Sequence, residues 1–310
     1  MNESSIAIHI ENVYKKFGRH TVINNLSLQV GYGEIYGFLG LNGAGKSTTI
    51  KLLLAMLKPN AGELRIMGEK ADAGNYKLWG NVGYLEEVTF YPELTVMENL
   101  EIARRMQCVS DRDSIQRVVS RLKLNQHINK KAKHLSMGNK QRLGLAKAMI
   151  HNPKILILDE PINGLDPAGI VEIRELIRDL SGNSGITVFM SSHLLEELSK
   201  LATRIGIIHE GRLIEEIKAD ILEHELEKYL MLDGKDRGSI KKILADKGYP
   251  FAVDPQGYIR LTDDYSVHNP ERMTELLVKS GQAPTMVNVI TENLESYFLR
   301  KISENKEGRP

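Results

Sequence analysis

The chain has 310 residues with 41 Lys and Arg against 40 Asp and Glu, and this balance argues against a non-specific nucleic-acid-binding protein, which carries a strong basic excess. The single cysteine, Cys108, excludes an internal disulfide and a cysteine-rich metal site and favours a reducing compartment such as the cytoplasm. No basic segment followed by an apolar stretch opens the chain, and no run of about 20 apolar residues occurs, so neither a secretory signal nor a membrane-spanning helix is expected.

The first two thirds of the chain predict an α/β fold. Alternating apolar and polar residues predict a half-exposed edge strand at 6–13 and a second strand at 23–30. Continuously apolar runs, which are typical of buried central strands, lie at 35–39, 155–158 and 186–190. Helices are expected between these strands, over 92–107, 111–123 and 138–150, and a turn at Glu210-Gly211 separates two short strands within 204–217. This alternation predicts a mixed sheet with parallel strands at its centre.

The sequence pattern changes after about residue 220, so we predict two domains, 1–220 and 221–310. The second domain is expected to be a small α+β domain with the order β-α-β-β-α-β, which matches the ferredoxin-like arrangement. Its predicted strands are 228–232, 250–254, 257–262 and 285–291, and its predicted helices are 238–247 and 270–280.

A final helix in this second domain has one apolar stripe. The stripe consists of Leu294, Tyr297, Phe298 and Ile302, spaced as on one helix face, and it is expected to be buried. It packs either on the small sheet of its own domain or against the first domain or a dimer mate. No glycine-rich loop, metal-ligand cluster or nucleophile arrangement occurs in 221–310, so we expect this domain to regulate or recruit and not to catalyse.

A glycine-rich segment follows the predicted strand 35–39. Residues 40–47 read GLNGAGKS and fit the pattern G-x-x-x-x-G-K-[ST], in which backbone N–H groups surround phosphate oxygens. Lys46 supplies a positive charge for the β- and γ-phosphates, and the Ser47 hydroxyl is a ligand for Mg²⁺. The alternative is a turn that only joins a strand to a helix. Kinases and GTPases share this loop, so it predicts a nucleoside triphosphate with Mg²⁺ and nothing narrower. The residues assigned to the nucleotide here are Gly40, Leu41, Asn42, Gly43, Ala44, Gly45, Lys46, Ser47 and Thr48.

Two acidic residues, Asp159 and Glu160, directly follow the predicted strand 155–158. Such a strand delivers Asp159 to the carboxyl edge of the sheet, where open α/β sheets bind ligands, and Asp159 suits the Mg²⁺ shell. Glu160 is then placed to orient or deprotonate an attacking water. The alternative is a strand that enters solvent with two acids for solubility.

His193 follows the strand 186–190 in the segment Ser191-Ser192-His193. A lone histidine is more often a surface or hydrogen-bonded residue than a catalytic one. If the three apolar strands are parallel, however, their carboxyl ends meet at one edge. His193 would then donate a hydrogen bond to the γ-phosphate or link that phosphate to Glu160.

The segment 135–142 reads LSMGNKQR and opens the predicted helix 138–150. Ser136 and Gly138 at a helix N-terminus offer a hydroxyl and free N–H groups to an anion, although a serine there is also an ordinary N-cap. Together with the phosphate loop, the acid pair and the histidine, this segment makes residues 6–217 resemble the ATPases of ABC transporters.

The resemblance implies a P-loop NTPase cassette, a mixed sheet with a helical subdomain, and an ATP-hydrolysing subunit of an ABC transporter. It implies catalytic roles for Glu160 and His193, adenine stacking by Phe17 and a D-loop position for Asp166 within Gly164-Leu165-Asp166. The expected partners are a separate integral membrane permease and a second cassette, most simply in a homodimer, with no nucleic acid. In such a pair, Ser136 and Gly138 would face the ATP held by the other cassette. The expected location is peripheral, on the cytoplasmic face of the membrane.

Two positions depart from the family pattern. In the signature, Met137 and Asn139 stand where glycine and glutamine are usual. After Val82-Gly83-Tyr84-Leu85, Glu86 and Glu87 stand where a glutamine normally contacts Mg²⁺. Counting from Gly83 favours Glu87 as the metal ligand, and a local deletion would favour Glu86. Alternatively, both acids are exposed loop residues.

Two further segments, 91–100 and 293–299, are similar to those of single-cassette ATPases from drug, antibiotic-peptide and self-protection exporters, so we expect export. A translation-factor-like protein acting on ribosomes would carry two cassettes. A DNA-repair ATPase would carry a long coiled coil between phosphate loop and signature, yet Lys46 and Ser136 are 90 residues apart. The cargo itself is contacted by the permease and is not encoded here.

Overall fold

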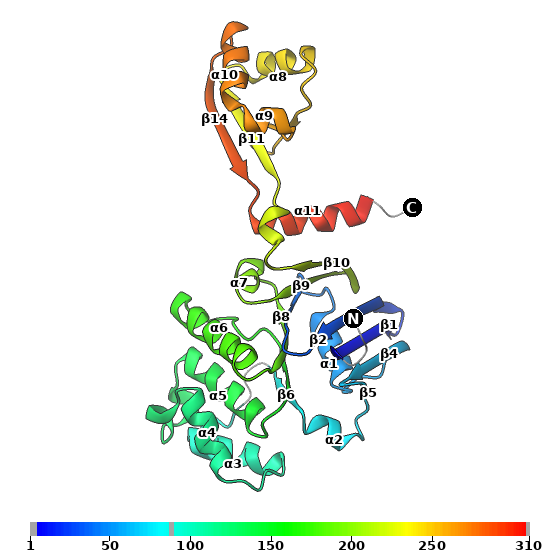
Figure 1. The fold of residues 1–310 in the computed structure, drawn as a ribbon, viewed down its shortest axis with the longest axis vertical. Helices are drawn as coiled ribbons and strands as arrows, with labels where there is room; N and C mark the ends of the chain where they lie inside the picture. Colours follow the sequence, from blue (N-terminus) through cyan, green and yellow to red (C-terminus); the bar gives the residue numbers. More distant parts are fainter. Residues whose placement is uncertain (1–4, 87–89, 308–310) are drawn as a thin grey trace. The chain divides into compact units, whose positions relative to one another are not determined.

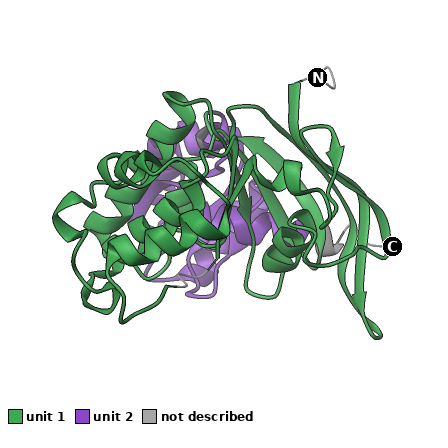
Figure 2. Ribbon diagram, turned by 90° about the horizontal axis from the view of Figure 1, so that it is seen from below, with its two compact units in different colours: residues 1–220 green, residues 221–310 purple. Residues whose placement is uncertain are grey.

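The computed structural model describes residues 5–86 and 90–307. The chain forms two compact units, residues 1–220 (unit 1) and 221–310 (unit 2), which Figure 2 shows in different colours. No helix within the described residues is both long enough and apolar enough to cross a membrane.

The larger sheet of unit 1 has six strands in the order β10-β9-β3-β8-β7-β6 (Figure 1). β3, β6, β7, β8 and β9 run parallel, and β10 is antiparallel to β9. This arrangement confirms the predicted mixed sheet, with β3 in its interior between β8 and β9. The strands are β3 (Ile35–Leu39), β6 (Val82–Leu85), β7 (Ile155–Leu158), β8 (Thr187–Ser192), β9 (Arg204–His209) and β10 (Arg212–Lys218).

The second sheet of unit 1 is antiparallel, with the order β2-β1-β4-β5. Its strands are β1 (Ile6–Phe17), β2 (His20–Gly31), β4 (Ala61–Ile66) and β5 (Glu69–Lys70). The prediction that 6–13 is an edge strand is wrong, because β1 pairs with both β2 and β4. Alternation of polar and apolar residues indicates that one face of a strand is exposed. It does not indicate whether the strand forms hydrogen bonds with a neighbouring strand on both sides.

The helices of unit 1 lie between these strands. They are α1 (Lys46–Leu53), α2 (Tyr76–Trp79), α3 (Val96–Met106), α4 (Asp113–Arg121), α5 (Met137–Met149), α6 (Pro167–Gly182) and α7 (Leu195–Ser199). Helix α3 begins at Val96, four residues later than the helix predicted at 92–107. The reason is that Thr95 caps the helix through a capping box with Glu98. α3, α4 and α5 pack together as a helical group, which agrees with the predicted helical subdomain (Figure 1).

A buried apolar cluster joins the two sheets of unit 1 with α1. It includes Ile8 and Ile10 from β1, Tyr36 and Phe38 from β3, and Ile50 from α1. Burial of a large aliphatic or aromatic side chain stabilises a fold by about 1.5–3 kcal/mol. The cluster therefore holds α1 in place, so that the loop before it starts from a fixed strand and ends at a fixed helix.

Unit 2 contains an antiparallel sheet with the order β12-β13-β11-β14. The sequence of its main elements, β11-α8-β12-β13-α10-β14, is the predicted β-α-β-β-α-β, with the short helix α9 added before α10 and α11 after β14. The assignment to the ferredoxin-like arrangement stays a prediction. The elements are β11 (Lys228–Gly234), α8 (Arg237–Asp246), β12 (Ala252–Val253), β13 (Ile259–Leu261), α9 (Asp264–His268), α10 (Pro270–Lys279), β14 (Pro284–Thr291) and α11 (Leu294–Glu307). The core under this sheet consists of Leu230, Leu232, Ile240, Leu244, Ile259, Leu261, Met273 and Leu277.

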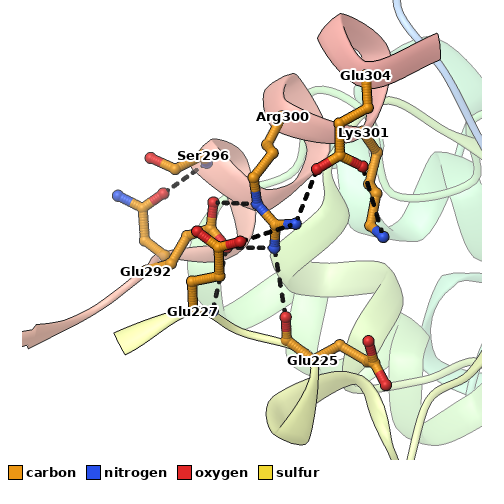
Figure 3. A network of polar contacts seen from close by, with 8 residues as sticks. Glu225, Glu227, Glu292, Ser296, Arg300, Lys301 and Glu304 are labelled. Carbon is orange, nitrogen blue, oxygen red and sulfur yellow. Dashed lines mark hydrogen bonds and ion pairs between the residues drawn. The ribbon is translucent and has the colours of Figure 1, made fainter. Parts of the chain in front are cut away.

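Helix α11 carries the predicted apolar stripe, and Tyr297, Phe298 and Ile302 are buried. The start of the helix is also fixed by a polar network around Arg300 (Figure 3). Arg300 forms two hydrogen bonds with the buried carboxylate of Glu292, at 2.8 and 3.1 Å, and pairs with Glu227 at 3.4 Å. Hydrogen bonding to Glu292 is the main reason that the pKa of the Arg300 guanidinium lies above its usual range. Because Glu227 precedes β11 and Glu292 follows β14, the network ties α11 to one end of this strand pair.

Replacing Arg300 with alanine should loosen α11, because the buried Glu292 carboxylate would lose its charged partner. We expect the free energy of local opening at 294–304 to fall by about 1–3 kcal/mol. Hydrogen exchange of the α11 amides measures this change. Arg272→Ala is the control, since its pair with Glu275 is exposed on α10 and should contribute little. Equal exchange rates in α11 of the two variants would contradict the anchoring role.

Candidate active site

The phosphate loop joins β3 to α1 and has the backbone that such a loop requires. Gly43 and Gly45 have φ values of 82° and 112°, which side chains disfavour. At Gly45 a Cβ atom would also lie 2.7 Å from Ile23 Cδ1. Gly45 is the N-cap of α1, and no side chain caps that helix. Its first N–H groups therefore point their partial positive charge at the loop, as an anion site needs.

Lys46 is the first residue of α1 and is 6% exposed. Its Nζ donates to the carbonyl of Gly40 at 2.7 Å and lies 3.3 Å from Glu160 Oε1. A buried ammonium group requires such partners, because desolvation disfavours an unpaired charge. The phosphate loop and the acid pair, which lie more than 100 residues apart in the sequence, thus meet in the fold.

Glu160 connects this lysine to the predicted histidine. Its Oε2 lies 2.9 Å from His193 Nδ1, while its Oε1 faces Lys46. The structure therefore brings together the three groups that the sequence places after β3, β7 and β8. A carboxylate can act as a general base, so this arrangement is compatible with the role predicted for Glu160, which stays a prediction.

A residue that the sequence analysis did not select, Ser191, also belongs to this site. Its hydroxyl donates to Asp159 Oδ1 at 2.6 Å and accepts from the backbone N–H of Glu160 at 2.9 Å. Ser191 stands two residues before His193 and is completely buried. Only the pairing of β7 with β8 brings it to the acids, so the sequence carries no signal beyond its place in the SSH segment.

A cavity of about 1040 Å³ opens beside these groups. It is lined by Ser47, Lys51, Glu86, Phe90, Met137, Lys140, Gln141, Asp159, Glu160, Asn163 and Gly164. Two of the predicted Mg²⁺ ligands, Ser47 at the start of α1 and Asp159 after β7, are in its wall. Glu86 is exposed and also lines the cavity, whereas Glu87, the preferred metal ligand, lies outside the described residues.

The signature serine, Ser136, does not line this cavity, whereas Ser47 of the phosphate loop does. Ser136 is the N-cap of α5, accepts from Asn139 Nδ2 at 3.0 Å and remains exposed. The residues of this segment that line the cavity are Met137, Lys140 and Gln141, not Ser136 or Gly138. No atom lies within 4 Å of the position a Gly138 Cβ would occupy, so this end of α5 is open.

Two other predicted nucleotide contacts also lie away from the cavity wall. Phe17 ends β1, is 48% exposed, and has Lys15 Nζ 5.1 Å from its ring centroid. Asp166 accepts from the N–H of Gly169 at 3.1 Å and caps α6. Its structural role as a cap is therefore visible, and its contact with a nucleotide stays a prediction.

Glu160→Gln should slow ATP hydrolysis by about 10²- to 10⁴-fold, because glutamine keeps the shape of the side chain but cannot accept a proton. ATP binding should persist, since the phosphate loop is unchanged. Single-turnover hydrolysis and equilibrium nucleotide binding measure the two effects. Glu175→Gln, on an exposed position of α6, is the matched control and should behave as the parent. Turnover of Glu160→Gln within threefold of the parent would exclude the base role.

The chain is similar to known proteins over almost its whole length. A family model described as ABC transporter matches residues 23–163. The chain is 36% identical over 307 residues to the bacitracin transport ATP-binding protein BcrA of Bacillus licheniformis, covering 98% of this chain and all of that protein. It is 34% identical to the Nod factor export ATP-binding protein I of Bradyrhizobium diazoefficiens, over 99% of this chain and all of that protein.

Solved structures agree with this result for the cassette. An ATP-binding subunit of an ABC transporter superposes with a TM-score of 0.62 at 26% identity, covering 71% of this chain and 92% of that one. A dimeric ATP-binding cassette in a post-hydrolysis state, bound to ADP and Pi, gives a TM-score of 0.61 at 26% identity over 68% of this chain and 98% of that one. These matches favour a transport ATPase over the ribosome- or DNA-acting alternative. The chain therefore belongs to the ABC transporter family, as an ATP-binding subunit that hydrolyses ATP.

Proposed function

We propose that this subunit powers export through a separate integral membrane permease, bound at the cytoplasmic face of the membrane. The observation that supports this most strongly is the similarity to the bacitracin transport subunit, because it extends over both units of the chain. The relatives named for bacitracin transport and for Nod factor export support export as the direction of transport. The permease is expected to contact the cargo and to set its identity.

Magnesium fits the oxygen donors of the site. Mg²⁺ binds through one or two carboxylates or hydroxyls together with phosphate oxygens and water, and it rarely has a full set of protein ligands. Ser47 and Asp159 supply such donors in one cavity wall, while no cluster of three or more His, Cys, Asp or Glu suited to a metal occurs among the described residues. When bound with ATP, the metal would neutralise phosphate charge. Glu87, the ligand preferred from the sequence, lies outside the described residues, and Glu86, the alternative, would add a second carboxylate from the cavity wall.

In the proposed reaction, some residues of the chain bind the phosphates and others act on the attacking water. Lys46 and the N–H groups at the start of α1 bind and orient the phosphates. Glu160 removes a proton from the attacking water, and its contact with His193 at 2.9 Å fixes the carboxylate toward the reacting centre. His193 is proposed to donate a hydrogen bond to the γ-phosphate or to link that phosphate to Glu160.

We further propose that the functional form is a homodimer in which each ATP lies between the phosphate loop of one copy and the signature of the other. The exposed Ser136 and the open space at Gly138 support this, because they present a helix N-terminus to a partner and not to the cavity of their own chain. Phe17 and Asp166, which also lie outside the cavity wall, would contact the nucleotide in the closed pair.

Unit 2 is proposed to regulate the cassette or to recruit the permease. All residues that line the described cavity belong to unit 1. Loss of unit 2 should therefore leave the nucleotide contacts of the phosphate loop in place.

The dimer is tested by placing a charge at the signature. In a Glu160→Gln background, ATP should drive dimerisation, and Gly138→Asp should abolish it because the carboxylate would face the triphosphate of the other copy. The monomer should still fold and bind ATP, since a Cβ at this position would meet no described atom within 4 Å beyond its chain neighbours and the backbone of its own helix. Light scattering with size exclusion measures the mass. Gly182→Asp, whose Cβ position is equally open, is the control. An ATP-dependent dimer of the Gly138→Asp variant would contradict the composite site.

Association with a permease is tested by affinity purification. The tagged full-length chain, extracted from detergent-solubilised host membranes, should bring an integral membrane protein with several spans of about 20 apolar residues. A tagged soluble protein of similar size serves as the control. Recovery of the chain without any membrane protein would contradict the proposed function.

A further inference from the structure

We propose that Ser191 is a positioning residue that holds the Asp159 carboxylate and the Glu160 backbone in one fixed arrangement. It thereby couples metal-dependent nucleotide binding to hydrolysis. This inference rests on the proposed function, in which Asp159 serves Mg²⁺ and Glu160 is the base.

The pairing of β7 with β8 creates the contact. The two strands are parallel, with Leu158 opposite Met190, so the next residues, Asp159 and Ser191, face each other at the edge of the sheet. Ser191 Oγ lies 2.6 Å from Asp159 Oδ1 and 2.9 Å from the nitrogen of Glu160. The buried Ser191 hydroxyl thus contacts the side chain of Asp159 and the backbone of Glu160.

The direction of the two hydrogen bonds follows from their chemistry. A serine hydroxyl has one hydrogen and accepts through its lone pairs. Because the Glu160 N–H can only donate, the hydroxyl accepts from it, and its own hydrogen is directed to Asp159. An ionised carboxylate is an acceptor only, so this geometry suits the charged Asp159 that a metal requires. One carboxylate oxygen is engaged, and the other remains available.

The backbone of Glu160 makes this support necessary. Glu160 has a φ of 49°, in the left-handed region that non-glycine residues rarely adopt. Such conformations cost free energy and persist only where the surrounding structure holds them. The backbone N–H of Asp159 donates to the carbonyl of Leu85 on β6. The backbone N–H of Glu160, in contrast, donates to Ser191 Oγ on β8. Ser191 therefore fixes the point at which the catalytic residue leaves the sheet.

The next residue, Ser192, is equally buried but forms a different hydrogen bond, which makes it a matched control. Its hydroxyl accepts from the N–H of Leu194 at 3.0 Å and does not contact either acid. If the contacts of Ser191 with the two acids have no role, Ser191→Ala should have no larger effect on metal binding than Ser192→Ala.

The test compares Ser191→Ala and Ser192→Ala in the full-length protein, with Mn²⁺ as the metal probe. Mn²⁺ binding in the presence of ADP is followed by electron paramagnetic resonance, and the metal dependence of hydrolysis is measured separately with ATP. Loss of a partner that orients a metal ligand typically reduces metal affinity or activity about 10- to 100-fold. We expect Ser191→Ala to raise the half-saturating Mn²⁺ concentration and to lower kcat by factors in that range. Metal-free ATP binding should stay within about twofold, since the contacts of Lys46 are unchanged.

Ser191→Thr keeps the hydroxyl and should restore most of the metal affinity, whereas Ser192→Ala should match the parent in every measurement. Unchanged Mn²⁺ affinity in Ser191→Ala, with metal-stimulated hydrolysis in the parent, would overturn this inference and leave the proposed function intact. A Ser191→Thr variant as weak as Ser191→Ala would assign the effect to packing and would also overturn it. Hydrolysis by the parent that needs no divalent metal would contradict the proposed function itself.

Discussion

The parallel alignment of β3, β8 and β7 is the constraint on which the whole active site depends. These strands are neighbours in the sheet, with Leu39 opposite Ser192 and Leu158 opposite Met190, so their carboxyl ends lie at one edge. Three segments that are far apart in the chain therefore deliver a lysine, two carboxylates and a histidine to the same place. Any change in the register of one strand would move its functional residue away from the other two.

Lys46 and Glu160 form an ion pair at this edge of the sheet. Lys46 is buried and satisfied by the Gly40 carbonyl and by Glu160, and Glu160 also contacts His193. A triphosphate at the loop would bring several negative oxygens to Lys46 and the N–H groups of α1, and these would compete with Glu160 for the lysine. Nucleotide binding would then leave the Glu160 carboxylate free to act on water.

The two units contribute in different ways. Unit 1 contains every residue that lines the described cavity, while unit 2 has its own sheet, its own core and an ion-pair network that fastens α11. Similarity to the relatives extends through both units, so unit 2 is part of what this chain shares with them and not an incidental extension.

The sequence by itself determined the groups whose geometry is local. The phosphate loop was predictable because its glycines, Lys46 and Ser47 act within one strand–turn–helix segment, and the buried strands were predictable from their continuous apolar runs. Tertiary structure alone decided that β1 lies inside its sheet, that Glu86 reaches the cavity wall, and that Ser191 joins Asp159 to Glu160. The physical reason is that each of these depends on which strands become neighbours. That choice is made by the packing of the shared core, which no single segment of the sequence contains.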